Sequence, residues 1–159
     1  LGVDLSARPD AVGRVVERVK VLEAEGWSFE AADASFELLV RNELGELSEP
    51  FTLESYRVIV ERREDGRVVS EATVKLHAKG ERIVATGEGN GPVNALDRAL
   101  RSALEPYHPA LAGMELTDYK VRILDGRHGT DAVTRVLVET GDGRREWTTV
   151  GVHVGSSYA

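Results

Sequence analysis

The sequence predicts an α+β fold in which a small helical segment precedes two repeated β-β-β-α units with mainly antiparallel sheets. Up to about residue 48, apolar residues recur at three- and four-residue steps, which is typical of helices. From Phe51 onward, apolar and polar residues alternate between turn signals, which is typical of half-buried strands. The turn Asp65-Gly66 recurs 60 positions later at Asp125-Gly126, and Gly80 recurs 63 positions later at Gly143. This recurrence indicates a duplicated unit.

Residues 1–48 are predicted to form two helices. Pro9 opens the first and Gly26 closes it, and Val12, Val15, Val16, Val19 and Leu22 recur in it at three- and four-residue steps. Ser28 is a candidate N-cap for a second helix from about Phe29 to Asn42, with inward positions at Phe29, Ala32, Phe36, Leu39 and Val40. Two short helices bury little surface by themselves. This segment therefore needs another element to pack on.

The first repeat covers residues 51–106. Its first strand alternates through Tyr56, Val58 and Val60 up to the hairpin signal Asp65-Gly66. A second strand runs to a turn at Lys79-Gly80, and a third passes through Ile83 and Ala85. A helix over 92–105 follows, with Pro92 at its first position and with Val93, Leu96, Leu100, Ala103 and Leu104 on one face.

The second repeat covers residues 114–159 and follows the same order. Its strands contain Leu116 to Ile123, then Val136 and Val138, then Trp147 to Val154. The repeat stops where its helix should begin, and Gly155-Ser-Ser-Tyr-Ala159 is a poor helix start. A missing helix would leave one sheet face uncovered, so we expect this sequence to be a piece of a longer chain.

Composition excludes several classes of function. The net charge of −7, with basic and acidic residues interleaved, argues against a nucleic-acid partner. The absence of cysteine excludes disulfides and thiolate sites and is compatible with a reducing cytoplasm, the expected location. No run of about 18 apolar residues that could span a membrane occurs. The histidines His77, His108, His128 and His153 are dispersed, so a metal site is not expected, and no catalytic constellation is visible.

The best candidate site is the glycine-rich run that precedes the predicted helix of the first repeat. Gly87, Gly89 and Gly91 can take positive φ and let the backbone approach a ligand. A helix start favours a carboxylate or phosphate. No Lys-Ser/Thr follows, so this is not a phosphate-binding P-loop, and Glu88 would repel a pyrophosphate. A zwitterion fits better, although a purely structural turn is the simpler interpretation.

Three runs together carry a family resemblance. They are Gly87-Glu-Gly-Asn-Gly-Pro-Val-Asn-Ala95, Asp118-Tyr119-Lys-Val-Arg-Ile123 and Gly129-Thr-Asp-Ala132. They resemble the C-terminal regulatory domain of the 2-isopropylmalate synthase and citramalate synthase family. The run from Ser28 to Val40 is similar to the linker subdomain of the citramalate synthase branch. The resemblance therefore divides the chain into a linker subdomain at 1–48 and a regulatory domain at 51–159.

The resemblance implies a function beyond the residues themselves. In this family a (β/α)₈ barrel condenses acetyl-CoA with a 2-oxo acid and uses a divalent metal. The regulatory domain dimerises and binds the pathway's end product, which is isoleucine for citramalate synthases and leucine for 2-isopropylmalate synthases. Neither catalytic residues nor a cofactor are expected in this fragment. The metal and acetyl-CoA would belong to the catalytic barrel, which this sequence does not include.

Carried over by motif, the resemblance implies an effector pocket built from both repeats. In a 2-isopropylmalate synthase the same pocket would hold leucine, and in a homocitrate-type relative it would hold another amino acid. Without an effector the domain would serve dimerisation alone. Asn94 departs from the family, whose members often carry Asp there. The implied effector-binding residues are Gly89, Asn90, Gly91, Val93, Leu116, Tyr119, Ile123, Asp131, Ala132, Val152 and Val154.

Overall fold

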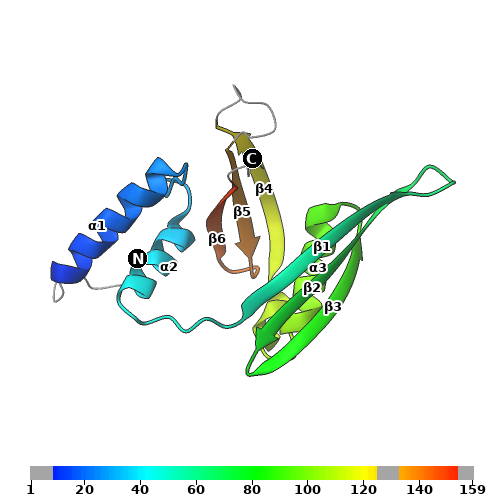
Figure 1. The fold of residues 1–159 in the computed structure, drawn as a ribbon, viewed down its shortest axis with the longest axis horizontal. Helices are drawn as coiled ribbons and strands as arrows, with labels where there is room; N and C mark the ends of the chain where they lie inside the picture. The colour runs from blue at the N-terminus through cyan, green and yellow to red at the C-terminus, as the bar shows by residue number, and fades with distance from the viewer. Residues whose placement is uncertain (1–8, 125–132, 154–159) are drawn as a thin grey trace, which may run out of the picture. The chain divides into compact units, whose positions relative to one another are not determined.

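The computed structural model describes residues 9–124 and 133–153 and confirms the α+β class (Figure 1). It contains two three-stranded antiparallel sheets, β1-β2-β3 and β4-β5-β6. The chain divides into two compact units. Residues Glu49–Gly113 form what we call the first-repeat unit, and Leu1–Ser48 with Met114–Ala159 form the linker unit. Each unit is described by itself.

The first-repeat unit is an antiparallel meander followed by a helix, as predicted. Its strands are β1 (Thr52–Arg62), β2 (Val68–Ala78) and β3 (Glu81–Gly89). Gly66 lies in the first hairpin with φ of 84°. Lys79 and Gly80 form the second turn with φ of 51° and 83°. Positive φ at both central residues suits the twist of a tight hairpin, which explains the sharp return of the chain here.

Helix α3 (Pro92–Leu104) packs on β2 and β3 through small side chains. Ala95, Ala99 and Ala103 are buried on the helix, and they belong to one core cluster with Ala72, Val74, Leu76 and Ala78 of β2. Leu104 is buried with them, and Leu96 and Leu100 pack against the same cluster. Val93, in the first turn of the helix, is 39% exposed.

The two helices of the linker unit end in the same way. After α1 (Pro9–Ala24), the N–H of Gly26 donates to the carbonyl of Glu23 and the N–H of Trp27 donates to that of Leu22. This pair of bonds is the Schellman motif, and Gly26 takes the left-handed φ of 100° that the motif requires. After α2 (Asp33–Glu43), Gly45 and Glu46 repeat the pattern with the carbonyls of Asn42 and Arg41. Gly26 therefore closes the first helix as predicted.

The start of the second helix differs from the prediction. Helix α2 begins at Asp33 with Ala32 at its N-cap, and Ser28 does not cap it. The ring of Phe29 lies 6.3 Å from that of Trp27 and 6.0 Å from that of Phe36. This aromatic packing holds the chain before Asp33 in a turn. The preference of polar residues for the N-cap position does not predict such packing.

The second sheet repeats the first in register and not only in strand order. It consists of β4 (Glu115–Ile123), β5 (Thr134–Gly141) and β6 (Glu146–His153). The first pair of strands has a register shift between Leu53 and Ser55, and β4 has one between Leu116 and Asp118. Tyr56 and Tyr119 follow these shifts at equivalent positions. The predicted duplication is therefore confirmed. The turn Asp125-Gly126 and the segment from Gly155 lie outside the described residues.

Helix α2 and the turn that follows α1 pack on this second sheet. Helix α2 contacts β6, and the backbone N–H of Val150 donates to Ser35 Oγ at 2.9 Å. The Arg135 guanidinium on β5 donates from Nε to the carbonyl of Gly26 at 2.7 Å. Ala32, Val40 and Val150 are buried. The first 48 residues thus belong to one compact unit with the second repeat.

We expect Gly26→Ala to lower the free energy of unfolding by roughly 2 kcal/mol, because it combines backbone strain with crowding. A Cβ at Gly26 would lie 3.0 Å from Leu124 Cδ1 and 3.0 Å from Val133 Cγ1. Gly45→Ala is the matched control, since Gly45 has φ of 70° with nothing within 4 Å of an added Cβ. Urea unfolding followed by circular dichroism measures both. Equal losses for the two variants would contradict the packing role of Gly26.

Candidate functional site

The start of helix α3 is an open N-terminus without a side-chain cap. Gly91 is the N-cap residue in an extended conformation, and Pro92 occupies the first turn as predicted. The N–H of Ala95 donates to the carbonyl of Gly91 at 3.0 Å. The N–H groups of Val93 and Asn94 have no intrahelical acceptor, as at any helix start. With no acidic residue in the first turn, this end of the helix favours an anionic group.

The glycines before this helix do not have the role that the sequence suggested. None of Gly87, Gly89 and Gly91 has a positive φ. A Cβ on Gly87 would lie 2.5 Å from the backbone nitrogen of Ala99, and one on Gly89 would lie 2.7 Å from that of Ala95. These two glycines therefore let helix α3 approach strand β3. At Gly91 an added Cβ would meet nothing within 4 Å. Of the three, only Gly91 remains open to a ligand.

The candidate residues of the second repeat share one face of its sheet. Alternation along the strands places Leu116, Tyr119 and Ile123 of β4 on the same side as Val136 and Val138 of β5. We call this side the front face, and it also includes Val121, Thr140, Trp147 and Thr149. Tyr119 is 48% exposed, and Ile123 is 68% exposed. The front face thus presents an aromatic ring and branched aliphatic side chains to the outside of the unit.

Val152 does not join these residues. It pairs with Arg135 and so lies on the opposite side of the sheet, the back face. Its Cγ1 is 3.7 Å from the position of a Cβ on Gly26, beneath the turn that follows α1. Asp131, Ala132 and Val154 lie outside the described residues. Gly89, Asn90, Gly91 and Val93 belong to the first-repeat unit, where they gather at the start of α3.

An apolar cleft extends the front face toward helix α2. Its volume is about 340 Å³, which falls within the usual range of small-molecule sites. Thr140, which pairs with Leu116, lines it from the sheet. Leu38 of α2 lines it from the helix and is 49% exposed. The full lining is Ala34, Glu37, Leu38, Met114, Thr140, Trp147 and Thr149.

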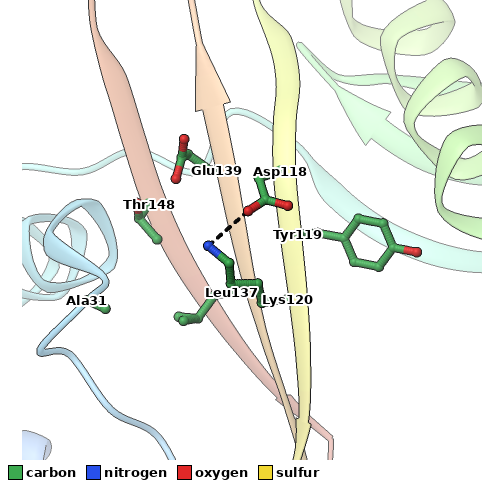
Figure 2. A pocket seen from close by; sticks show the side chains of 7 residues that line it. All are labelled: Ala31, Asp118, Tyr119, Lys120, Leu137, Glu139 and Thr148. Carbon is green, nitrogen blue, oxygen red and sulfur yellow. Dashed lines mark ion pairs between the residues drawn. The ribbon is translucent and has the colours of Figure 1, made fainter.

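The back face carries a smaller and polar cleft of about 130 Å³ (Figure 2). Figure 2 shows Asp118 and Lys120 facing each other there, while the ring of Tyr119 extends from the other side of β4. Lys120 Nζ lies 2.9 Å from Asp118 Oδ2. Its hydrogen bond lowers the pKa of Asp118, and the same bond raises the pKa of Lys120. Each of these two charges is satisfied by the other, and Glu139, which also lines the cleft, accepts a hydrogen bond from Thr117 Oγ1 at 3.3 Å.

Sequence reasoning missed the contribution of helix α2 to the front face. Leu38 is not among the inward residues predicted for the second helix, and Trp147 is predicted only as a residue of the last strand. Charge alternation in Asp118-Tyr-Lys-Val-Arg122 was a usable signal for the back face, because opposite charges two residues apart on a strand share one side. No sequence signal placed α2 beside β6.

The described residues contain neither a cluster of metal ligands nor a membrane-spanning helix. Across residues 9–124 and 133–153, no group of three or more His, Asp or Glu side chains could hold a metal ion. In the same ranges, no helix is long and apolar enough to cross a membrane.

Comparison with known proteins assigns these features to a family. Residues 30–156 match the family model of the LeuA allosteric (dimerisation) domain. The chain is 63% identical to an (R)-citramalate synthase of Streptomyces coelicolor over 153 residues, covering 96% of this chain and 29% of that protein. It is 45% identical to an (R)-citramalate synthase of Aquifex aeolicus, over 95% of this chain and 29% of the relative. A 2-isopropylmalate synthase of Dictyoglomus turgidum is 28% identical, over 86% of this chain and 24% of the relative. The chain thus spans less than a third of the length of these relatives.

Proposed function

The chain belongs to the LeuA allosteric (dimerisation) domain family, and on that premise we propose that it regulates an (R)-citramalate synthase by binding isoleucine. Isoleucine would act as the feedback inhibitor of the condensation of acetyl-CoA with pyruvate. The parent enzyme would be an acyltransferase whose catalytic (β/α)₈ barrel lies outside this sequence. The observation that carries the proposal is the exposed front face, where Leu116, Tyr119 and Ile123 stand together.

Each unit, taken by itself, offers chemistry that suits a part of a branched-chain amino acid. The amides of Val93 and Asn94 at the open start of α3 would receive the carboxylate. The aliphatic side chain would pack against Leu116, Tyr119 and Ile123. The ammonium group would be held by Asp131 or by backbone carbonyls.

We place this effector site in a homodimer, because the matched family model describes a dimerisation domain. Apolar side chains of β4 that are exposed in this unit, such as Val121 at 54% beside Tyr119, would take part in this association. The other partner would be the catalytic barrel of the same protein.

Inhibition would follow from a shift between two arrangements of the dimer and its linker helices. Isoleucine would bind one arrangement more tightly and so disfavour the barrel geometry that turnover needs. Coupling free energies of this kind are typically about 1–3 kcal/mol. A modest difference in affinity between the two arrangements therefore suffices.

Parallel isothermal titrations with isoleucine, leucine and valine test the proposal. We expect saturable binding of isoleucine with a dissociation constant at least about tenfold below that of leucine, a difference of about 1.4 kcal/mol. Preference for leucine would instead assign the chain to a 2-isopropylmalate synthase, a reading that the weaker likeness to the Dictyoglomus turgidum relative allows. No saturable heat from any of the three, with the chain folded and dimeric, would favour a dimerisation module without an effector.

A further inference from the structure

We propose that helix α2 senses occupancy of the front face, and that Ser35 and Arg135 are the positioning residues that fasten the linker to the effector sheet. This inference rests on the proposed function and names the route by which the site communicates. It concerns only the linker unit, in which helices and sheet are packed together.

Helix α2 reaches both the open edge and the front face of the sheet. Strand β6 is one of the two outer strands of its sheet, so within the described residues the outward N–H of Val150 has no neighbouring strand to pair with. Ser35 Oγ accepts that N–H at 2.9 Å, where Val150 is only 7% exposed. One turn further along the helix, Leu38 forms a wall of the apolar cleft that continues the front face. The same helix therefore contacts the effector face and is fastened to the strand edge.

A second fastening joins the linker to the back face. Arg135 Nε donates to the Gly26 carbonyl at 2.7 Å, and Gly26 sits close above Val133 and Val152. Arg135 precedes Val136, whose side chain lies on the front face. Strands β5 and β6 thus carry front-face residues and linker anchors at adjacent positions along the chain.

Adjacent positions of this kind couple effector binding to linker docking. An effector that orders the front face reduces the entropy that docking of the linker must lose on the same strands. Linkage requires the reverse effect with the same factor, so loosening the linker must weaken the effector. The Val150 amide reports directly on this equilibrium, because its hydrogen exchange depends on the bond to Ser35.

The test combines isoleucine titration with hydrogen exchange on the 159-residue chain. For Ser35→Ala we expect isoleucine affinity to fall about fivefold, at the lower end of typical allosteric coupling. In the wild-type chain, isoleucine should slow exchange at Val150, and this slowing should vanish in Ser35→Ala. Ser35→Thr keeps the hydroxyl acceptor and should restore both readouts. Arg135→Met removes the second anchor and should weaken isoleucine in the same direction, whereas Ser102→Ala, an exposed serine on α3, should change neither readout.

The outcomes separate this inference from the function on which it rests. Saturable isoleucine binding that is equal in the wild type, Ser35→Ala and Arg135→Met, with exchange at Val150 indifferent to the ligand, would overturn the coupling and leave the effector site standing. Absence of isoleucine binding to the wild type would overturn both. Weaker binding in Ser35→Ala that Ser35→Thr does not restore would assign Ser35 a general folding role and would also overturn the inference.

Discussion

We expect Gly87→Ala to destabilise the first-repeat unit by about 3 kcal/mol or more, at the upper end for overpacking of a core. The added Cβ would lie 2.5 Å from the nitrogen of Ala99 and 2.7 Å from the carbonyl oxygen of Ala95. Both are backbone atoms within helix α3, so no side-chain rotation relieves the clash. The helix must move away from β3, and this opens the core around Ala72 and Val74. Urea unfolding followed by circular dichroism measures the loss.

Gly91→Ala is the matched control for this substitution. Gly91 lies in the same glycine-rich run, has an extended backbone and leaves an added Cβ with nothing within 4 Å. Because Ala is a poorer N-cap than Gly, we expect its free energy of unfolding to fall by only about 1 kcal/mol, well below the loss at Gly87. Equal stability of the two variants would contradict the role of Gly87 in the close contact between helix α3 and strand β3.

The second large effect concerns the effector. We expect Tyr119→Ala to weaken isoleucine binding at least about tenfold, which corresponds to about 1.4 kcal/mol. The ring is 48% exposed on the front face between Leu116 and Ile123. Its removal should therefore change the stability of the fold little, whereas the ligand would lose an apolar contact. Calorimetric titration measures affinity, and the unfolding midpoint verifies the fold.

Tyr56→Ala is the internal control that the duplication supplies. Tyr56 occupies the equivalent register position in the first repeat and is 62% exposed. Its replacement should leave isoleucine affinity within about twofold, since it lies outside the effector residues. Equal losses of affinity in both variants would mean that the tyrosines act through association of the chains and not through contact with the ligand.

Most of the fold can be predicted from the sequence because glycine-containing turns mark the ends of the strands. Asp65-Gly66, Lys79-Gly80 and the Gly141-Asp-Gly143 turn each end a strand where alternation stops, and the structure has them there. The start of α2 was misplaced because aromatic packing around Phe29 outweighs the capping preference of Ser28. Trp27 and Phe36 are close to Phe29 in the chain, but a capping pattern contains no information on how aromatic rings pack.

The candidate site was predicted less well than the fold. Gly87 and Gly89 matched a ligand-binding pattern, yet they face the backbone of α3. Glycines before a helix form the same sequence pattern in two cases: where a ligand approaches the backbone, and where the helix itself packs closely on the strand. The side of the sheet on which Tyr119 lies follows from alternation, whereas the wall that Leu38 contributes depends on how α2 packs against β6.

Mapping isoleucine onto the ¹⁵N-labelled chain by NMR titration tests the central claim most directly. The account predicts saturable shifts at the amides of Asn90, Gly91 and Val93 and at those of Tyr119 and Ile123, with smaller shifts reaching Ser35. Saturable shifts confined to the polar back-face cleft around Lys120, with the start of α3 unchanged, would contradict the proposed site.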